Sequence, residues 1–280
     1  MALVPFPGSK TDPVQYTPPE DDDLDRDDEL DGAGGKMSFL EHLDELRKRL
    51  VWSVASIGFG FCVALWFIDR IFGFIMRPLA ATVPSGGKMI YTEPTEAFML
   101  QLKVAALAGV VIAAPLVMWQ LWLFIAPGLY RREKRLAVPF VFFASILFVG
   151  GAAFNHYVVF PTAFRFLGSF STDYMQFLPR ISPVFSLYAQ LLLAFGMIFQ
   201  MPVLVFTLAR LGLVTAGFLW KNTKYAVLII FIIAAVITPT SDVVTQTLMA
   251  APMVLLYVVS IVIAWMFGRS GDRAERWADN

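Results

Sequence analysis

The sequence is poor in the residues that hold metals and form disulfides. Its 280 residues include one cysteine, Cys62, and two histidines, His42 and His156. A single cysteine cannot form a disulfide within the chain or a thiolate metal site. Two histidines are too few for a histidine-rich metal centre. We therefore expect neither a metal nor a cofactor.

Charged residues are also scarce, and the usual catalytic motifs are missing. Charged side chains make up 16% of the chain and hydrophobic ones 58%, whereas soluble domains carry about a quarter charged residues. No H-E-x-x-H, G-x-S-x-G or phosphate-binding P-loop motif occurs. The composition predicts an integral membrane protein, and the missing motifs argue against an ATPase or an intramembrane protease. We expect no enzymatic activity and no nucleic-acid partner.

Six apolar stretches account for this composition. They are residues 51–68, 104–130, 136–164, 181–209, 225–241 and 243–268. A helix needs about 20 such residues to cross a bilayer, so the sequence predicts an all-α integral membrane protein with six transmembrane helices. Residues 238–241 have turn chemistry, so the fifth helix should end near Ile237, and we expect the fifth and sixth helices to be short. Prolines inside the runs remove backbone donors, which predicts a kinked, concave bundle.

The N-terminal part of the chain has a different composition. Nine of the twelve residues from Glu20 to Asp31 are acidic. Such a run repels itself and builds no core, so we expect residues 1–36 to be a disordered acidic tail, with an acidic binding arm as the alternative. Residues 37–268 would then form the transmembrane domain, and residues 269–280 a short cytoplasmic tail.

Lysine and arginine are distributed unevenly between the two sides of the predicted bundle. Thirteen lie before the first span, in the second-to-third and fourth-to-fifth connections, or after the sixth span; five lie on the other side, with Lys103 at a boundary. Basic connections stay cytoplasmic, so we expect both termini in the cytoplasm. The first outer loop, residues 69–95, is long enough to form a cap on the outer face.

A charged, amphipathic segment, S-F-L-E-H-L-D-E-L-R-K-R-L, precedes the first span at residues 38–50. Ser38 and Glu41 match a capping box at a helix start. Apolar residues recur every three or four positions, and basic residues crowd its end. The pattern predicts a helix that lies on the membrane surface and continues into the first span. A generic signal anchor with basic flanks is the alternative.

Three further groups of polar residues lie within or beside the predicted spans, where polar groups are costly. Residues 122–133 run from an aromatic segment into a charged loop, and an aromatic belt followed by a solvated Glu133 explains them as well. Gln200 lies deep in the fourth run, where a hydrogen bond between helices would satisfy it. The last group surrounds the fifth turn and consists of Thr238, Asp242, Gln246 and Thr247. Asp242 could also simply cap the sixth helix.

Together these segments resemble the TatC family, the polytopic receptor subunits of the twin-arginine protein translocase. The resemblance rests on H-L-D-E-L-R-K-R-L at 42–50, W-L-F-I-A-P-G-L-Y at 122–130 with E-K-R at 133–135, F-G and Q-M-P within 195–202, and T-P, Asp242 and Q-T within 238–247. It extends in order over residues 38–267, and its first two motifs are long and specific. The acidic tail lies outside it.

The resemblance implies a receptor site on the inner face. Glu45 and Glu133 would bind the arginine pair of a signal peptide, and arginine forks indeed pair best with carboxylates. The side chains that would shape or support this site are Arg47, Arg49, Phe124 and His42.

The resemblance also implies partner subunits. Thr238 and Gln246 would form a polar patch for the single-span subunits TatA and TatB, with Gln200 as a further contact. The family often carries glutamate at the position of Gln200, so a role that needs a titratable acid there is not carried over. The residues assigned outer-face or structural roles are Asp242, Pro78 and Pro127.

The implied function is that of a receptor and scaffold for export of folded proteins, driven by the proton-motive force without nucleotide. Such a protein would lie in the inner membrane of a prokaryote, with copies of the chain associating in the complex. A secondary transporter of a small solute is the alternative, since kinked helices and polar groups near the midplane suit one. The chain shows no internal repeat and few acids inside its spans, which argues against a transporter.

Overall fold

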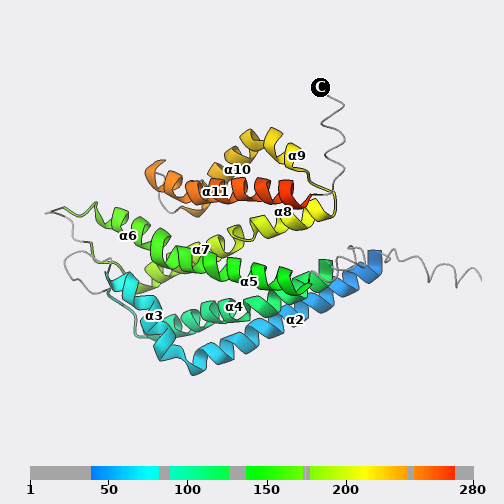
Figure 1. The fold of residues 1–280 in the computed structure, drawn as a ribbon. Coiled ribbons are helices and arrows are strands. Elements are labelled where there is room, and N and C mark those ends of the chain that lie inside the picture. The colour runs from blue at the N-terminus through cyan, green and yellow to red at the C-terminus, as the bar shows by residue number, and fades with distance from the viewer. Residues whose placement is uncertain are drawn as a thin grey trace, which may run out of the picture. The chain divides into compact units, whose positions relative to one another are not determined.

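Helices account for most of the structure (Figure 1). The computed structural model describes residues 39–81, 89–125, 137–172, 174, 177–238 and 243–268. In these ranges no strand forms, and Ile90 and Arg180 make an isolated bridge. The predicted all-α fold is confirmed. The chain divides into two units, residues 1–44 and 45–280; the architecture below is that of the second unit, and helix α2 begins in the first.

The first two spans are antiparallel helices. Helix α2 runs over Phe39–Trp66, so the charged segment and the apolar run form one continuous helix. Helix α3, Ile68–Ala81, occupies much of the predicted outer loop, and α4, Glu96–Ile125, returns across the bundle. Helices α2 and α4 come close at two glycines, since a Cβ atom on Gly60 would lie 2.4 Å from the carbonyl oxygen of Gly109. Any larger residue at Gly60 would push the two helices apart.

The third span contains a π-helical turn. It consists of α5, Ala137–Phe154, the π-helix η5, Asn155–Val159, and α6, Phe160–Gly168. Pro161 lies in the first turn of α6, and since proline has no backbone donor, it cannot close a regular α-helical hydrogen bond there. Single π-helical turns often occur at functional sites, and this one carries two buried polar residues, Asn155 and His156.

The fourth span is broken before its end. Helix α7, Ile181–Ile198, ends in a turn at Phe199 and Gln200, and α8, Met201–Arg210, follows. Pro202 lies in the first turn of α8. Backbone N–H groups in the first turn of a helix have no acceptor within that helix, so proline costs no hydrogen bond there. The sequence predicts a bend from this proline, and the structure shows a break between α7 and α8 directly before it.

The last two spans differ in length. The short α9, Ala216–Lys221, leads into α10, Thr223–Ile237, whose 15 residues rise about 22 Å. Helix α11, Val243–Phe267, has 25 residues and rises about 37 Å, more than the ~30 Å of a hydrocarbon core. The prediction of a short fifth helix is therefore confirmed, and that of a short sixth helix is wrong. The apolar run continues without a break, and Pro252 removes only one backbone donor from it.

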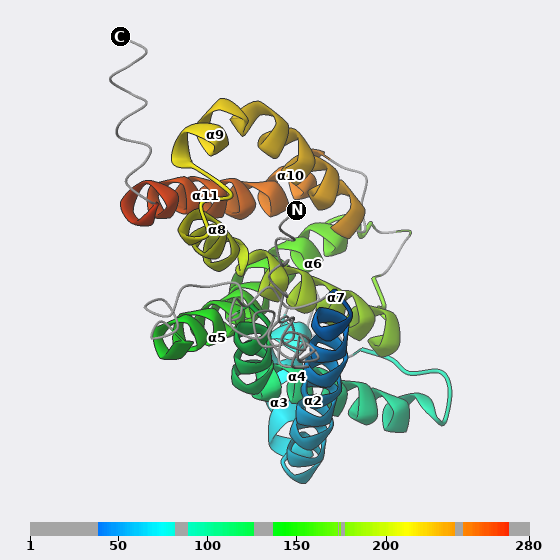
Figure 2. The ribbon, with the colours of Figure 1, turned by 90° about the vertical axis from the view of Figure 1, so that its right-hand side faces the viewer.

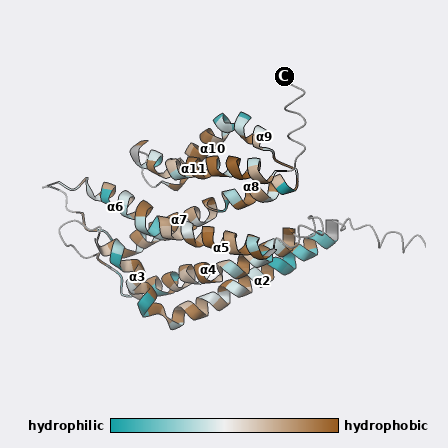
Figure 3. Cartoon of the chain, in the orientation of Figure 1, coloured by the Kyte–Doolittle hydropathy of each residue, from teal (hydrophilic) through white to brown (hydrophobic). Residues whose placement is uncertain are grey.

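The surface of the helices fits a bilayer. In the described part of the chain, five helical segments are long and apolar enough to cross a membrane, and α10 is a shorter apolar helix. Figure 3 shows hydrophobic residues along α4, α5, α10 and α11. Large apolar side chains such as Phe142 and Phe143 are exposed, as expected where lipid rather than water surrounds the protein. The chain is a multi-pass membrane protein.

Helix α7 lies at the centre of the packing, against α4, α5 and α10 (Figures 1 and 2). Its rings Phe185, Tyr188 and Phe195 are almost fully buried, and Phe160 packs edge-on against Tyr188 at 5.3 Å. Because the spans alternate in direction, the bundle has two ends. We call them the Glu45 end, where α4, α8 and α11 finish, and the Glu96 end, where α3 lies and where α4 and α7 begin.

Candidate functional site

Glu45 and Arg49 form an ion pair on one face of α2. The residues are four positions apart, which places their side chains one above the other on a helix. Arg49 Nη2 donates to Glu45 Oε1 at 3.0 Å, and the two side chains are only 15% and 23% exposed for Glu45 and Arg49 respectively. The pair is therefore held largely away from solvent at the start of the first span.

The pair leaves two of its buried polar atoms without a hydrogen bond in the described part of the chain. Glu45 Oε2 and Arg49 Nε are buried, and neither has a partner among the residues that the structure describes. A carboxylate can accept a two-pronged bond from arginine, whereas a buried polar atom without a partner costs about 1–3 kcal/mol. The free Oε2 is therefore an acceptor that a donor from another molecule could satisfy.

Other buried polar atoms without partners gather at the same end. Within the described ranges there are five such atoms, and besides the two just named they include Gln120 Oε1 and Arg210 Nε. Gln120 lies in the last turns of α4, and Arg210 is the last residue of α8. Four of the five thus lie at the Glu45 end. This end has the incomplete polar surface expected of a binding site.

The remaining residues predicted for this site are only partly described. Arg47 is exposed, as is His42 in the first unit of the chain. Phe124 is half-buried near the end of α4, so the structure brings it to the Glu45 end. Glu133 and Pro127 lie outside the described residues.

Gln200 is buried between helices. Its side chain is 8% exposed, and its Nε2 donates to the carbonyl oxygen of Ala144 in α5 at 2.9 Å. This bond ties the break between α7 and α8 to the third span. It agrees with the hydrogen bond between helices that the sequence offered as one account of this residue.

Thr238 and Gln246 lie at the Glu96 end, on the last two spans. Thr238 is 7% exposed and donates back to the carbonyl of Ala234 at 2.6 Å, where it ends α10. Gln246 Nε2 donates to the carbonyl of Phe231 at 2.9 Å, which joins α11 to α10. Asp242, between them in the sequence, lies outside the described residues.

Pro78 lies inside α3, the amphipathic helix at the Glu96 end. It is half-buried, and its neighbour Leu79 is fully buried. The outer-face or structural role assigned to Pro78 stays a prediction.

The sequence reasoning missed Glu96, a buried carboxylate at the start of α4. Its Oε2 accepts from the backbone N–H of Thr92 at 2.9 Å, and its Oε1 accepts from that of Ser182 at 3.3 Å. Arg180 Nη2 lies 3.8 Å from Oε2. An acid directly after the turn signal Thr-Glu-Pro-Thr could have suggested a helix cap, but its bond to α7 is not visible in the sequence.

A second missed group is buried in the π-helical turn. His156 Nδ1 lies 2.8 Å from the hydroxyl oxygen of Tyr188, and Asn155 Nδ2 lies 3.4 Å from the carbonyl oxygen of the same residue. Phe74 of α3 stacks on the imidazole ring at 4.6 Å. Two adjacent polar residues inside an apolar run could have marked this position. No cluster of candidate metal ligands occurs in the described ranges.

The comparisons with known proteins agree with the geometry. The family described as "Sec-independent protein translocase protein (TatC)" matches residues 41–252. The chain belongs to the TatC family. The TatC protein of Koribacter versatilis (strain Ellin345) is 44% identical over 245 residues, which cover 86% of this chain and 90% of that protein. The TatC protein of Desulforapulum autotrophicum is 44% identical over 243 residues, 87% of this chain and 90% of the relative.

A solved structure extends the match to three dimensions. The structure described as "Crystal Structure of Twin Arginine Translocase Receptor- TatC" has a TM-score of 0.71 and 35% identity, and it covers 82% of this chain and 100% of that one. Membership in the family makes this chain a component of a Sec-independent, twin-arginine protein translocase and not an enzyme. The prediction of a role in protein translocation is confirmed.

Proposed function

We propose that this TatC-family chain is the receptor and core scaffold of its translocase, and that it binds the arginine pair of a signal peptide at Glu45 and Glu133. It works in the cytoplasmic membrane of a prokaryote, with both termini in the cytoplasm, and the proton-motive force drives export. Its partners are single-span subunits like TatA and TatB, further copies of the chain, and folded cargo that carries the signal.

The observation that carries this proposal is the free Oε2 of Glu45. An arginine in full solvent gains roughly 0–1 kcal/mol from a carboxylate, too little for specific recognition. A charge-assisted bond to a shielded carboxylate gains about 1.5–3 kcal/mol. Glu45 is 85% buried on its helix face by the accessible area of its side chain, and one of its oxygens is unused. It therefore offers the stronger kind of contact.

Arg49 has a supporting part in this proposal. Its bond to Oε1 fixes the Glu45 carboxylate and leaves Oε2 as the remaining acceptor. Its charge, with that of Arg47, repels isolated cations. A single lysine gains little against that repulsion, whereas an arginine pair offers planar forks that fit two carboxylates. Glu133 is the second carboxylate of the proposal, by its position in the family motif.

The partner patch rests on Thr238 and Gln246. Both lie at the Glu96 end, and α10 beside them is too short to span a bilayer of ordinary thickness. The side-chain amide of Gln246 donates to the carbonyl oxygen of Phe231, while its own carbonyl oxygen has no partner within the described ranges. That oxygen could accept a polar hydrogen from a neighbouring single-span helix.

The test uses two signal peptides and three variants of the purified protein in nanodiscs. Glu45→Gln and Glu133→Gln should each weaken binding of a twin-arginine peptide several-fold or more. The same changes should matter far less for a twin-lysine peptide, which cannot form the fork. Asp44→Asn is the matched control, because it makes the same charge change at an exposed neighbour of Glu45 on α2.

Fluorescence anisotropy of the labelled peptides gives the affinities. Equal losses of affinity for the twin-arginine and the twin-lysine peptide would show that the two acids act only through their general negative charge. Unchanged binding in Glu45→Gln and Glu133→Gln would remove both from the site, and a loss in Asp44→Asn as large as that in Glu45→Gln would show that only net charge matters.

A further inference from the structure

A cavity at the Glu96 half of the bundle has both apolar walls and unused polar groups. It encloses about 380 Å³, within the range of small-molecule pockets. Helices α3, α4, α5 and α7 and the π-helical turn contribute its walls, which include Phe74, Leu107, Val111, His156 and Tyr188. Arg70 also lines it, from the first turn of α3.

His156 presents an unused donor in this cavity. The residue is 3% exposed, and its only hydrogen bond in the described part of the chain joins Nδ1 to the hydroxyl of Tyr188. The Tyr188 hydroxyl can donate to Nδ1, and in that tautomer, which the proposal below uses, the imidazole proton sits on Nε2. The stacked ring of Phe74 holds the imidazole in place. In that tautomer Nε2–H has no acceptor among the described residues, and since His156 lines the cavity, a ligand there could supply one.

Arg70 provides a positive charge one helical turn from Phe74, the ring that stacks on His156. Residues four apart share a helix face, so Arg70 and Phe74 lie on the same side of α3, and Phe74 stacks on His156. Arg70 is exposed and has no ion-pair partner among the described residues. The lining of the cavity therefore combines a cation, a hydrogen-bonding imidazole and apolar walls.

The first span fixes the depth of Arg70 in the bilayer. From Glu45 to Trp66, α2 rises roughly 32 Å, about the thickness of the hydrocarbon core. Arg70 follows directly after that stretch, so we expect it near the lipid phosphates on the side opposite Glu45. The cation, the imidazole and the apolar walls match the phosphate, ester carbonyl and acyl chain of a lipid.

We propose that this cavity binds one anionic glycerophospholipid from the leaflet opposite Glu45. Its phosphate pairs with Arg70, an acyl ester carbonyl accepts from His156 Nε2–H, and the chain lies against Leu107 and Val111. The bound lipid fills the gap between α3 and the third span. It would hold α3 against the bundle without any contact to the receptor site.

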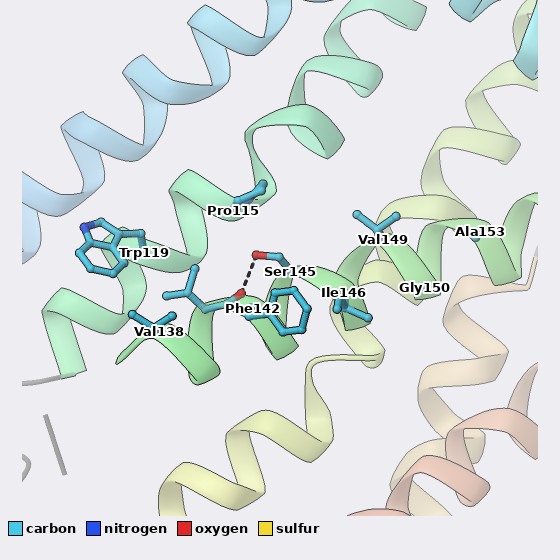
Figure 4. A pocket seen from close by; sticks show the side chains of 10 residues that line it. Pro115, Trp119, Val138, Phe142, Ser145, Ile146, Val149, Gly150 and Ala153 are labelled. Atoms are coloured by element: carbon cyan, nitrogen blue, oxygen red, sulfur yellow. Dashed lines mark hydrogen bonds between the residues drawn. The ribbon is translucent and has the colours of Figure 1, made fainter. Parts of the chain in front are cut away.

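A second cavity shows what a surface without such recognition looks like. It encloses about 720 Å³ on the outside of α4 and α5, beside Pro115, Val149 and Ala153 (Figure 4). The hydroxyl of Ser145 in its wall is already donated to the carbonyl of Val141 at 2.6 Å, and Trp119 is exposed at one end. No charged side chain lines it. It suits loosely held acyl chains of any lipid.

The test is native mass spectrometry of the full-length protein with phosphatidylglycerol as the probe. Wild-type protein should retain one phosphatidylglycerol that Arg70→Gln and His156→Phe each lose, with at least a several-fold drop in occupancy. Arg77→Gln is the matched control, because Arg77 is exposed on the same helix and does not line the cavity. It should keep the lipid.

Two further arms identify the chemistry. A diether phosphatidylglycerol lacks the ester carbonyl. It should bind the wild type more weakly than ordinary diester phosphatidylglycerol does, whereas His156→Phe should bind the two lipids equally. Excess inorganic phosphate should not displace the lipid. Retention of phosphatidylglycerol by Arg70→Gln, which changes only an exposed side chain and should fold normally, would overturn the proposal. An equal loss in Arg77→Gln, or displacement by phosphate, would do so as well.

Discussion

Glu45 and Glu96 are mostly buried carboxylates at opposite ends of the same bundle. Glu96 uses both oxygens within its own chain, on two backbone N–H groups, and lies near Arg180. Glu45 uses one oxygen on Arg49 and leaves the other buried without a partner in the described residues. Both glutamate side chains are mostly buried, but both oxygens of Glu96 accept hydrogen bonds and, within the described ranges, only one oxygen of Glu45 does.

We interpret this difference as that between a structural carboxylate, Glu96, and a carboxylate that is available to a ligand, Glu45. The bond that Glu96 accepts from Ser182 joins the start of α4 to the start of α7, and the bond from Thr92 fixes the chain that leads into α4. The single bond of Glu45 stays within one helix, where an ion pair of this kind contributes roughly 0.3–0.5 kcal/mol. A buried acid that stabilises so little is better explained by a ligand that completes it than by the fold.

The largest expected effect is on stability, at Glu96. Glu96→Ala should lower the thermal unfolding midpoint by several degrees, because it leaves the N–H groups of Thr92 and Ser182 without their acceptor. Glu93→Ala is the matched control: Glu93 faces the same Arg180 at 3.7 Å but is 70% exposed. Circular dichroism in detergent measures both. Equally small shifts of the unfolding midpoint in Glu96→Ala and Glu93→Ala would show that Glu96 stabilises the fold no more than an exposed acid does.

The second effect is the converse, at Glu45. Glu45→Gln should leave the unfolding midpoint nearly unchanged, since the variant loses only a local pair, while affinity for a twin-arginine peptide falls roughly tenfold or more. Adding the peptide should raise the midpoint of the wild type and much less that of the variant. A large loss of stability in Glu45→Gln without peptide would make this acid structural, as Glu96 is.

A smaller effect is expected at Gln246. Gln246→Leu should weaken association with the single-span subunits by on the order of 1 kcal/mol, or about fivefold, and leave peptide binding nearly unchanged. Co-purification of the labelled subunits with the variant gives the ratio. Loss of peptide binding in Gln246→Leu would show that the polar patch also contributes to the peptide site. The two ends of the bundle would then not have separate functions.

The smallest effect concerns the acidic tail. Deleting residues 1–34 should change neither the unfolding midpoint nor peptide affinity, because so acidic a segment has too little apolar surface to offset the cost of ordering. Thermal unfolding and anisotropy on the truncated protein check this. A tail that competes with the arginine pair would instead reveal itself as tighter peptide binding after the deletion.

Local patterns were enough to predict the helices. Hydropathy gave six spans, Thr238 and the turn after it marked the end of α10, and Pro202 marked the break in the fourth span. The prediction of a short α11 failed because the helix, which begins directly after Asp242, continues through the whole apolar run to Phe267. The motif around Glu45 identified the receptor candidate, because both its helix and its ion-pair partner lie within one turn.

The sequence by itself determined the class, the spans and the family, since apolar length and short motifs are properties of contiguous residues. Only the tertiary structure decided which polar groups are satisfied. Glu96 finds Ser182 across 86 positions and His156 finds Tyr188 across 32, and such partners meet only when helices pack. Glu45 Oε2 has no such distant partner among the described residues, and no local pattern in the sequence reveals that this oxygen is unpaired.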